Sequence, residues 1–324
     1  MVTDYHCVSL PAEFVDPNAN VDPVTAIAFT EGPAVASDGT VYFSDLANNR
    51  IMQFDPQSGM HSVWREPSGY ANGLLFDRNG RLLTCEGIGL SSDGRWHGGR
   101  RITQTNMTTG SVEVLTERYE GARFNAPNDI AACSNGRIFF TDPCYADRTT
   151  MEMEHESVYR IDPNGTVLRM ISQPDIERPN GIALAPDEQT IYVVDSCPVF
   201  GGNRKIWAFD LADDGSLSNQ RVVFDFAPGR GADGMTIDQQ GNLYIAAGIS
   251  RSRGPHESND VPPGIWIVKP SGELQGRVPI PEDVVTNVTF GGEDLRTLYI
   301  TAGKTLFTIR GKVPGFVVHR NINL

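Results

Sequence analysis

The sequence predicts an all-β protein, a six-bladed β-propeller with four antiparallel strands in each blade. A short pattern recurs six times: an acidic or amide residue, usually a Gly, an apolar run, a turn pair and a second apolar run. The copies lie about 40 to 55 residues apart, which leaves room for four strands in each. Gly and Pro are plentiful, at 33 and 21 residues, as many short strands and turns require.

The six copies can be followed in order along the chain. In the first three copies the leading residue and the hairpin sequence after it are Glu31 with AVASDGTVYFSD, Asn72 with LLFDRNGRLLTC, and Asn128 with IAACSNGRIFFTD. In the last three copies they are Asn180 with IALAPDEQTIYVVD, Asp233 with MTIDQQGNLYIAA, and Asn287 with VTFGGEDLRTLYIT. In each copy a pair such as Asp-Gly or Asn-Gly separates two apolar runs, which is typical of a β-hairpin.

The outer two strands of each blade are expected between the copies, for example in RIMQFDP and SVWRE. The sixth copy is followed by only one clear strand, TLFTIR, and a Pro-Gly stretch. The strand-like run from Val24 to Phe29 precedes the first copy, so we expect the N-terminal segment to complete the last blade. Closing the ring in this way removes exposed sheet edges. Residues 1–324 are therefore predicted to form a single propeller domain.

The residue that leads each copy is predicted to lie at the mouth of the central channel. In a propeller the innermost strand of every blade begins near the axis, so symmetry gathers the leading residues into one ring. All six carry a side-chain oxygen, as two carboxylates and four amides. Asn-Gly is also a common turn pair, which explains some of the Asn positions. Turn chemistry does not explain Glu31 or Asp233, so a shared site is the preferred interpretation.

Four long connections should lie on the same face as this ring and wall a pocket above it, because the second strand returns to that face. They span residues 87–101, 143–157, 196–205 and 248–264. Candidate substrate contacts on them are Arg95, Trp96, His97, Arg101, Tyr145, Phe200 and His256. Four second strands end in an acid that either supports the ring from behind or caps a turn: Asp45, Glu86, Asp142 and Asp195.

The ring favours binding of a hard divalent cation. Two carboxylates at one channel mouth would repel, and a cation would remove that conflict. Carboxylate and amide oxygens suit Ca²⁺, Mg²⁺ or Mn²⁺, and Zn²⁺ or Fe²⁺ bound through oxygen stays open. Such an ion can polarise a carbonyl or phosphoryl oxygen while a carboxylate takes a proton from water. The chemistry indicated is hydrolysis of an ester, lactone or phosphoester, and the sequence shows no GxSxG motif of a serine hydrolase.

Four segments in order resemble the gluconolactonase/regucalcin family: FTEGP at 29–33, FNAPNDI at 124–130, RPNGIAL at 178–184 and ADGMTID at 232–238. The resemblance extends from about residue 26 to 310. It implies a six-bladed propeller with one catalytic divalent cation, calcium being preferred, and hydrolysis of sugar lactones to aldonic acids. By motif position, Glu31, Asn180 and Asp233 would bind the ion, and Asp233 would also be the general base. Asn128 would contact the ion or the substrate.

The remaining expected substrate contacts are Asn72, Glu86, Arg101 and Asn287. One position departs from the animal branch of the family, which has an Arg two residues before the Asn of the third motif. This sequence has Ala126 there, so the resemblance implies no sugar contact of the animal type and is closer to the microbial branch.

The composition narrows the class of partner. A net charge of −13 argues against nucleic acid and anionic membrane surfaces. No apolar stretch is long enough to span a bilayer, and MVTDYHCVSL does not read as a signal peptide. We expect a cytoplasmic monomer or small homo-oligomer, with a periplasmic or secreted location left open. Cys144 and Cys197 could form a disulfide, but free thiols are expected.

Three functions remain open from the sequence. The first is a metal-dependent lactonase acting on a sugar lactone. The second is a metal-dependent phosphotriesterase or arylesterase on the same propeller. The third is a non-enzymatic interaction propeller with a structural calcium, which would have no need of so many oxygen-bearing ring residues.

Overall fold

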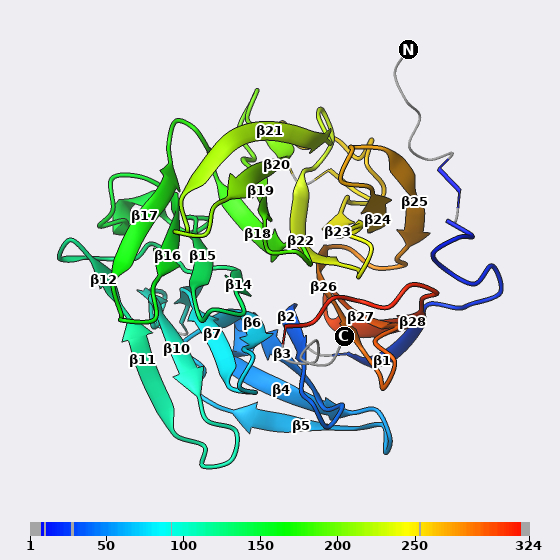
Figure 1. Ribbon diagram of the computed structural model, residues 1–324, viewed down its shortest axis with the longest axis horizontal. Helices are drawn as coiled ribbons and strands as arrows, with labels where there is room; N and C mark the ends of the chain where they lie inside the picture. The colour runs from blue at the N-terminus through cyan, green and yellow to red at the C-terminus, as the bar shows by residue number, and fades with distance from the viewer. Residues whose placement is uncertain (1–7, 10, 27–28, 92, 253, 319–324) are drawn as a thin grey trace.

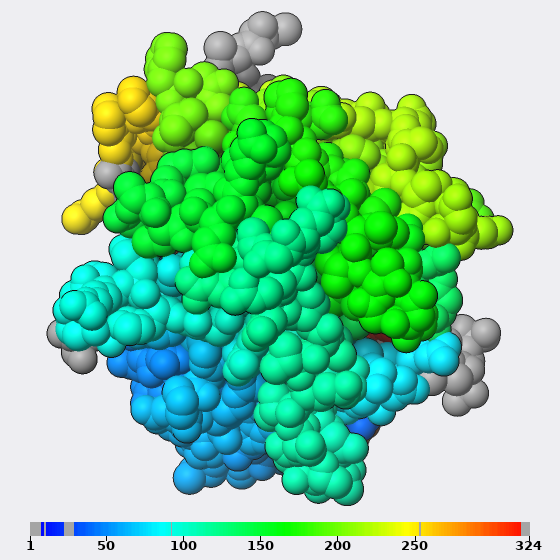
Figure 2. Space-filling view, turned by 90° about the vertical axis from the view of Figure 1, so that its left-hand side faces the viewer, coloured from blue at the N-terminus to red at the C-terminus, as the bar shows by residue number. Residues whose placement is uncertain are grey.

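A computed structural model of the protein describes residues 8–9, 11–26, 29–91, 93–252 and 254–318. Six four-stranded antiparallel sheets are arranged around a central axis as blades (Figure 1). This arrangement confirms the all-β six-bladed propeller predicted from the repeats. In the space-filling view of Figure 2, turned by 90°, segments coloured blue, cyan and green lie packed against one another on the side that faces the viewer.

In each of the first three blades the strands follow one another in chain order from the axis outward. The first blade has β2 (Thr30–Val35), β3 (Val41–Asp45), β4 (Arg50–Asp55) and β5 (Met60–Arg65). The second has β6 (Ala71–Phe76), β7 (Leu82–Glu86), β10 (Arg101–Thr105) and β11 (Val112–Thr116). The third has β14 (Ile130–Ala132), β15 (Ile138–Asp142), β16 (Ser157–Ile161) and β17 (Val167–Ser172).

The other three blades are also built outward from the axis. The fourth has β18 (Pro179–Leu184), β19 (Thr190–Ser196), β20 (Arg204–Leu211) and β21 (Leu217–Asp225). The fifth has β22 (Ala232–Ile237), β23 (Leu243–Ala247), β24 (Gly264–Val268) and β25 (Leu274–Pro279). The sixth has β26 (Val285–Gly291), β27 (Thr297–Ala302), β28 (Thr305–Arg310) and β1 (Asp22–Ala26).

The sixth blade contains both ends of the described propeller. Strand β1 pairs antiparallel with β28, with Asp22 opposite Thr308 and Ala26 opposite Thr305. An N-terminal strand thus forms the outer edge of the last blade. The first and last blades are thereby joined by backbone hydrogen bonds as well as by packing.

Smaller elements decorate the connections. Two short hairpins are β8 (Gly89–Leu90) with β9 (Trp96–His97), and β12 (Arg118–Tyr119) with β13 (Ala122–Arg123). Two 3₁₀ turns are η2 (Leu46–Asn48) and η3 (Arg148–Thr150). No helix in the described part of the chain has the length and apolar character needed to cross a bilayer.

The core is divided among the junctions between blades. Each of six apolar clusters in the described residues draws on two adjacent blades. Tyr42 of the first blade meets Phe76 of the second edge to face, with ring centroids 5.7 Å apart. Tyr244 of the fifth blade meets Phe290 of the sixth in the same way at 4.9 Å. Each blade is therefore held by its two neighbours, and the radial spacing of the inner strands is fixed by packing.

A β-bulge stands at the start of the inner strand in five blades. The strand register shifts between Glu31 and Ala34, and equivalent shifts begin the inner strands of the second, fourth, fifth and sixth blades. A bulge changes the direction of the side chain that it carries, and in these five blades it lies at the predicted leading residue or, in the sixth, next to it.

Glycine follows the leading residue because neighbouring blades almost touch there. A Cβ on Gly32 would lie 2.1 Å from the carbonyl oxygen of Asn72, and Gly32 has a φ of +42°. A Cβ on Gly181 would lie 2.5 Å from the carbonyl oxygen of Asp233. Only a residue without a side chain allows this approach, so the glycines set how closely the leading residues gather.

The C-terminal segment covers the other end of the channel. The amide of Phe316 donates to the carbonyl of Ile237, and the amide of Gly315 donates to the carbonyl of Leu295. These acceptors lie beside the turns that join first and second strands, at the end of the channel away from the leading residues. Access from solvent to the ring is therefore through the mouth.

Candidate functional site at the channel mouth

A cavity of about 350 Å³ opens at the channel mouth. Five of the six predicted ring residues line it, one from each of the first five blades: Glu31, Asn72, Asn128, Asn180 and Asp233. All but Asn72 are buried. All four long connections also contribute lining residues, as expected from the direction of the second strands.

Asn287 does not belong to this ring, which corrects the sequence alignment of the sixth copy. In the fifth blade Ala232 pairs with Ala247, and in the sixth Val285 pairs with Ala302, so Thr286 is the counterpart of Asp233. Asn287 takes the place of the glycine and lines a different cavity, deeper in the channel. The repeat is shifted by one residue because the sixth copy lacks that glycine.

Glu31 and Asp233 bring two acidic side chains into one buried site. Burial raises the pKa of Glu31 well above its usual range, and the charge of Asp233 raises it further. Asp233 has a positive neighbour, because Arg230 Nη2 donates to Asp233 Oδ2 at 3.0 Å. Arg230 Nε also lies 3.9 Å from Glu257 Oε1. The amide of Gly32, which donates to Glu31 Oε2 at 3.1 Å, and the charge of Arg230 lower the pKa of Glu31, but burial and Asp233 still keep it raised.

The side chain of Asn180 is oriented by Tyr145. Asn180 Nδ2 donates to Tyr145 Oη at 2.9 Å, and that hydroxyl in turn donates to the carbonyl of Ser196 at 3.3 Å. A phenol has one proton, so a hydroxyl that donates to a carbonyl must accept from the amide. The nitrogen of the Asn180 amide is thus assigned by its partner, and its oxygen is left for the ring.

Acids at the ends of the second strands support the ring through the backbone. Asp45 accepts from the amide of Phe29 at 3.2 Å. Asp142 accepts from the amides of Asn125 and Ala126, both at 2.8 Å. Asp195 does the same for the two residues before Pro179. These carboxylates fix the segment that leads into the inner strand, so they both cap the chain and position the ring residues.

Hydroxyls of the second strands link neighbouring blades at the ring. Ser44 Oγ donates to the carbonyl of Asn72 at 2.7 Å, and Thr141 Oγ1 donates to the carbonyl of Asn180 at 2.6 Å. Each bond joins one blade to the leading residue of the next. The sequence offered a signal for these residues, since Ser44 and Thr141 both directly precede an Asp at the end of a strand.

Glu86 and Arg101 were expected to contact substrate, and the structure places them elsewhere. Arg101 Nε donates to Glu86 Oε2 at 2.6 Å, while Thr103 and Arg65 donate to Glu86 Oε1. Glu86 is fully buried and does not line the mouth cavity. It joins the outer strand of the first blade to the second blade, because Arg65 ends β5 while Arg101 and Thr103 lie on β10. A buried carboxylate needs several such donors to offset its desolvation.

The loop residues divide into two groups. Trp96 and Tyr145 line the mouth cavity. Arg95, His97, Phe200 and His256 do not; Phe200 is 85% exposed and meets His256 edge to face outside the cavity. Sequence reasoning missed Arg230 and Glu257, which do line it. The signal available for Arg230 was its position three residues before Asp233.

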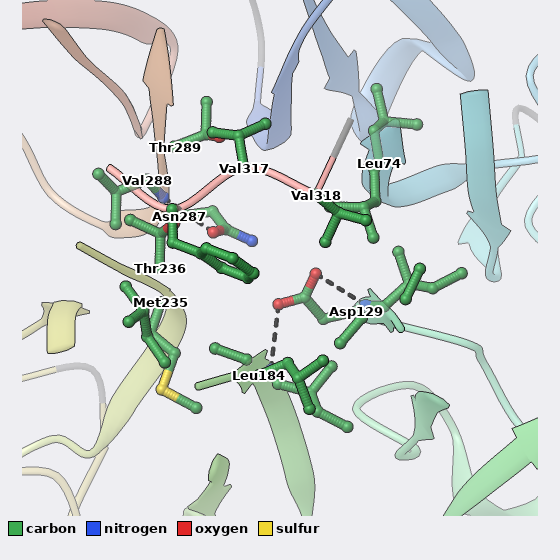
Figure 3. Close-up of a pocket in the computed structure, with 18 of the residues that line it drawn as sticks. Leu74, Asp129, Leu184, Met235, Thr236, Asn287, Val288, Thr289, Val317 and Val318 are labelled. Atoms are coloured by element: carbon green, nitrogen blue, oxygen red, sulfur yellow. Dashed lines mark hydrogen bonds between the residues drawn. The ribbon is translucent and has the colours of Figure 1, made fainter. Parts of the chain in front are cut away.

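A second, smaller cavity of about 90 Å³ lies deeper in the channel. Its lining is mostly apolar, with Asp129 facing inward from the third blade and the C-terminal Val317 and Val318 covering it (Figure 3). Asp129 accepts from the amide of Ile130 at 3.0 Å. Burial raises the pKa of Asp129 to about 7. Asp129 occupies the position that holds glycine in other copies, so it sits below the ring.

The mouth residues fit a hard divalent cation by their chemistry. Glu31 and Asp233 supply carboxylate oxygens, and Asn180 and Asn128 supply amide oxygens, all from buried side chains. Nowhere in the described ranges do three or more His, Cys, Asp or Glu side chains gather in a metal-binding group. An ion at the mouth would therefore depend on amide oxygens and water for the rest of its coordination. Calcium and magnesium accept such ligands readily.

The cysteines do not form a metal or redox centre among the described residues. Cys85, Cys133, Cys144 and Cys197 are all buried free thiols. Cys144 and Cys197 thus remain unpaired with each other, and Cys7 lies outside the described residues.

The fold and the mouth together define a six-bladed propeller with carboxylate and amide side chains gathered at one end of its channel. Residues 29–304 match the SMP-30/gluconolactonase/LRE-like family, and the chain belongs to that family. A gluconolactonase from Zymomonas mobilis is 31% identical to it over 307 residues, covering 89% of this chain and 80% of that protein.

Solved structures share this fold. A gluconolactonase from Xanthomonas campestris has a TM-score of 0.76 at 29% identity, with 94% of each chain covered. A calcium-binding protein from Agrobacterium tumefaciens, described as a regucalcin, has a TM-score of 0.71 at 19% identity, covering 92% of this chain and 96% of its own. The protein is therefore a gluconolactonase-like lactonase, the enzyme class that the sequence predicted.

Proposed function

We propose that this protein opens a sugar lactone to the aldonic acid with the help of one divalent cation, for which calcium is the preferred ion. The observation that carries the proposal is that the carboxylates of Glu31 and Asp233 line one cavity and are both buried, beside the side-chain amides of Asn180 and Asn128. Two buried carboxylates at one mouth suit a site that binds a further positive charge, in addition to the guanidinium of Arg230 beside Asp233. The calcium-binding relative from Agrobacterium agrees with this choice of ion.

Glu31, Asn180 and Asp233 would hold the ion, and Asn128 would hold it or the substrate. When bound, the ion supplies Lewis acidity that polarises the lactone carbonyl and offsets the charge developing on its oxygen. Asn72 and Asn128 are available to bind substrate, since no side chain in the described part of the chain forms a hydrogen bond with the side-chain amide of either residue.

Asp233 is the proposed general base. Its carboxylate takes a proton from water, whose oxygen adds to the carbonyl carbon of the lactone. The bond between that carbon and the ring oxygen then breaks, the ring oxygen takes a proton, and the product is a hydroxy acid. Arg230 Nη2 donates to Asp233 Oδ2 at 3.0 Å, and this hydrogen bond fixes the orientation of the carboxylate.

The test is hydrolysis of glucono-δ-lactone in a pH-stat, with calcium, with chelator, and with calcium added back. Turnover should disappear with chelator and return with calcium. Asp233→Ala should lower kcat by about a hundredfold or more, the usual loss on removing a general base. Unchanged activity in Asp233→Ala would reject it as the base. The same assays with a phosphotriester and an aryl ester test the competing hydrolase function.

A further inference from the structure

The wall of the mouth cavity changes character from one side to the other. Beside the ring residues, the fourth and fifth blades present the polar or charged Ser196, Arg230 and Glu257 together with Pro198. Above Glu31 and Asn72, the first and second blades present four apolar side chains: Phe29, Leu46, Ile88 and Trp96. Apart from Glu31 at the base, no charged side chain of these two blades lines the cavity within the described residues.

The apolar side is held in place by the backbone around it. Phe29 is anchored by its amide, which donates to Asp45, and Leu46 follows directly in η2. Ile88 and Trp96 belong to the 87–100 connection, which is tied back by Gly87 donating from its amide to the carbonyl of Tyr70 at 2.9 Å. A Cβ on Gly98 would lie 2.0 Å from the carbonyl oxygen of Gly87, so the two ends of this connection pack closely.

Trp96 gives this wall an open aromatic surface. Trp96 lines the cavity and is 37% exposed, so it is not fully covered by other side chains. An indole and three aliphatic or aromatic neighbours bind an apolar group by removing its surface from water. They offer no acceptor for a sugar hydroxyl, and Trp96 offers a single N–H donor.

A polyhydroxylated lactone would place hydroxyls against these four side chains, which accept no hydrogen bond, while Glu31 and Asn72 offer acceptors only at the base. A hydrophobic pocket discriminates against one added hydroxyl by up to about a hundredfold. An apolar substituent at the same place would instead gain about threefold to fourfold in binding for each buried methylene. The polar half of the cavity remains for the lactone group and any hydroxyls close to it.

We propose that the preferred substrate is a lactone that carries an apolar substituent, with the substituent on Phe29, Leu46, Ile88 and Trp96 and the lactone group at the ring. This inference rests on the proposed lactonase function. It makes the four side chains specificity-determining residues within the lactonase function, and it ranks glucono-δ-lactone, with ring hydroxyls at C2, C3 and C4, as a weaker substrate than a lactone with an apolar substituent.

The test compares δ-lactones of one ring size with the full chain and calcium: glucono-δ-lactone, δ-hexalactone with a methyl group, and δ-decalactone with a pentyl group. Each kcat/KM is divided by the rate of spontaneous hydrolysis in the same buffer, which removes differences in intrinsic reactivity. The normalised value for δ-decalactone should exceed those for δ-hexalactone and glucono-δ-lactone by about tenfold or more. An equal or higher value for glucono-δ-lactone overturns this inference and leaves the proposed function intact. No turnover of any lactone overturns both.

Variants of the wall provide a matched comparison. Trp96→Gln and Leu46→Gln should reduce the advantage of δ-decalactone over glucono-δ-lactone by about tenfold each, chiefly through KM. Leu90→Gln is the control: Leu90 is 58% exposed on the same connection and does not line the cavity, so the ratio should not change. A ratio that is unchanged in both wall variants overturns the inference.

A binding measurement removes turnover from the test. 6-Pentyl-2-piperidone, a lactam that resists hydrolysis, should bind in a calorimeter at least about tenfold more tightly than glucono-δ-lactam, and Trp96→Gln should erase the difference. Equal binding of the two lactams by the unmodified protein contradicts an apolar subsite.

Discussion

The hydroxyl of Tyr145, in the β15–β16 connection of the third blade, accepts a hydrogen bond at 2.9 Å from Nδ2 of Asn180, on the inner strand of the fourth blade. Arg178 lies over the ring of Tyr145, 5.3 Å from its centroid, and Arg178 is itself paired with the buried Glu156. The orientation of a proposed cation ligand is thus set by residues of two blades. Partners that orient a metal ligand in this way usually account for tenfold to hundredfold in metal affinity.

Tyr145→Phe tests this relationship. The variant keeps the ring on Arg178 and removes the acceptor of Asn180, so calcium affinity should fall by about tenfold while the unfolding midpoint changes little. Calorimetric titration of calcium into chelator-treated protein measures the affinity. Tyr119→Phe, in the outer hairpin β12–β13, is the control and should bind calcium like the unmodified protein. Equal affinities in the two variants would show that Tyr145 does not orient Asn180.

Glu86→Gln tests the corrected role of Glu86. Because Glu86 is a buried acceptor for Arg65, Arg101 and Thr103, the neutral amide should leave the Arg charges uncompensated. The expected loss is about 3 kcal/mol in the free energy of unfolding, with KM for lactone nearly unchanged. Urea denaturation and lactone kinetics measure the two effects. Glu273→Gln, which loses an exposed pair with Lys269, should leave the urea midpoint unchanged. A large rise in KM with normal stability would restore Glu86 as a substrate contact.

The close contact at Gly181 gives a prediction about spacing between blades. A Cβ there would lie 2.5 Å from the carbonyl oxygen of Asp233, so Gly181→Ala should push the fourth and fifth blades apart. We expect a loss of about 2 kcal/mol or more in stability, together with weaker calcium binding. Gly254→Ala is the control, because a Cβ at Gly254 meets nothing within 4 Å. Thermal unfolding and calcium titration of both variants decide the matter, and a Gly181→Ala protein that behaves like the unmodified one would refute the packing argument.

Asp142 predicts a specific dependence of stability on pH. Burial raises the pKa of Asp142 to about 7, the nearby Glu156 raises it, and the amides of Asn125 and Ala126 and the charge of Arg100 lower it. A carboxyl whose pKa is raised on folding binds more protons when folded, so its stabilisation is complete below about pH 4 and is lost as pH rises to about 7.

Asp142→Asn should therefore reduce the fall in unfolding free energy between about pH 4 and pH 7. Urea denaturation at a series of pH values, in chelator, measures the slope for both proteins. Asp210→Asn, in an exposed pair with Arg221, serves as the control and should leave the slope of the unmodified protein in this window. An unchanged slope in Asp142→Asn would show that Asp142 ionises normally in the folded protein.

Much of the fold could be predicted because the repeat itself encodes it. Turn pairs between apolar runs mark the inner hairpins, and the short sixth copy indicates that another strand must complete the last blade. Asn287 shows where pattern reading fails: with no glycine after it, the sixth copy can be aligned one residue early or late. Strand pairing resolves the choice in favour of Thr286, because register depends on hydrogen bonds that one sequence does not display.

The ring could be anticipated from radial symmetry, whereas the partners of its members could not. Glu86 carries the same charge as Glu31, and only burial beside Arg65 and Arg101 separates a structural acid from a functional one. Arg230 and Glu257 come from connections that have no repeated pattern, so no comparison among copies could identify them. The side chains that surround a site depend on tertiary contacts, and these connections vary most from copy to copy.

The central claim is that Glu31, Asn180 and Asp233 hold one divalent cation at the channel mouth. Anomalous diffraction from a crystal soaked in Mn²⁺ tests it most directly. We expect a single strong peak at the mouth, within about 2.6 Å of a side-chain oxygen of each of the three residues. A peak elsewhere, or a mouth without a peak in an enzyme whose lactone turnover survives chelation, would contradict it.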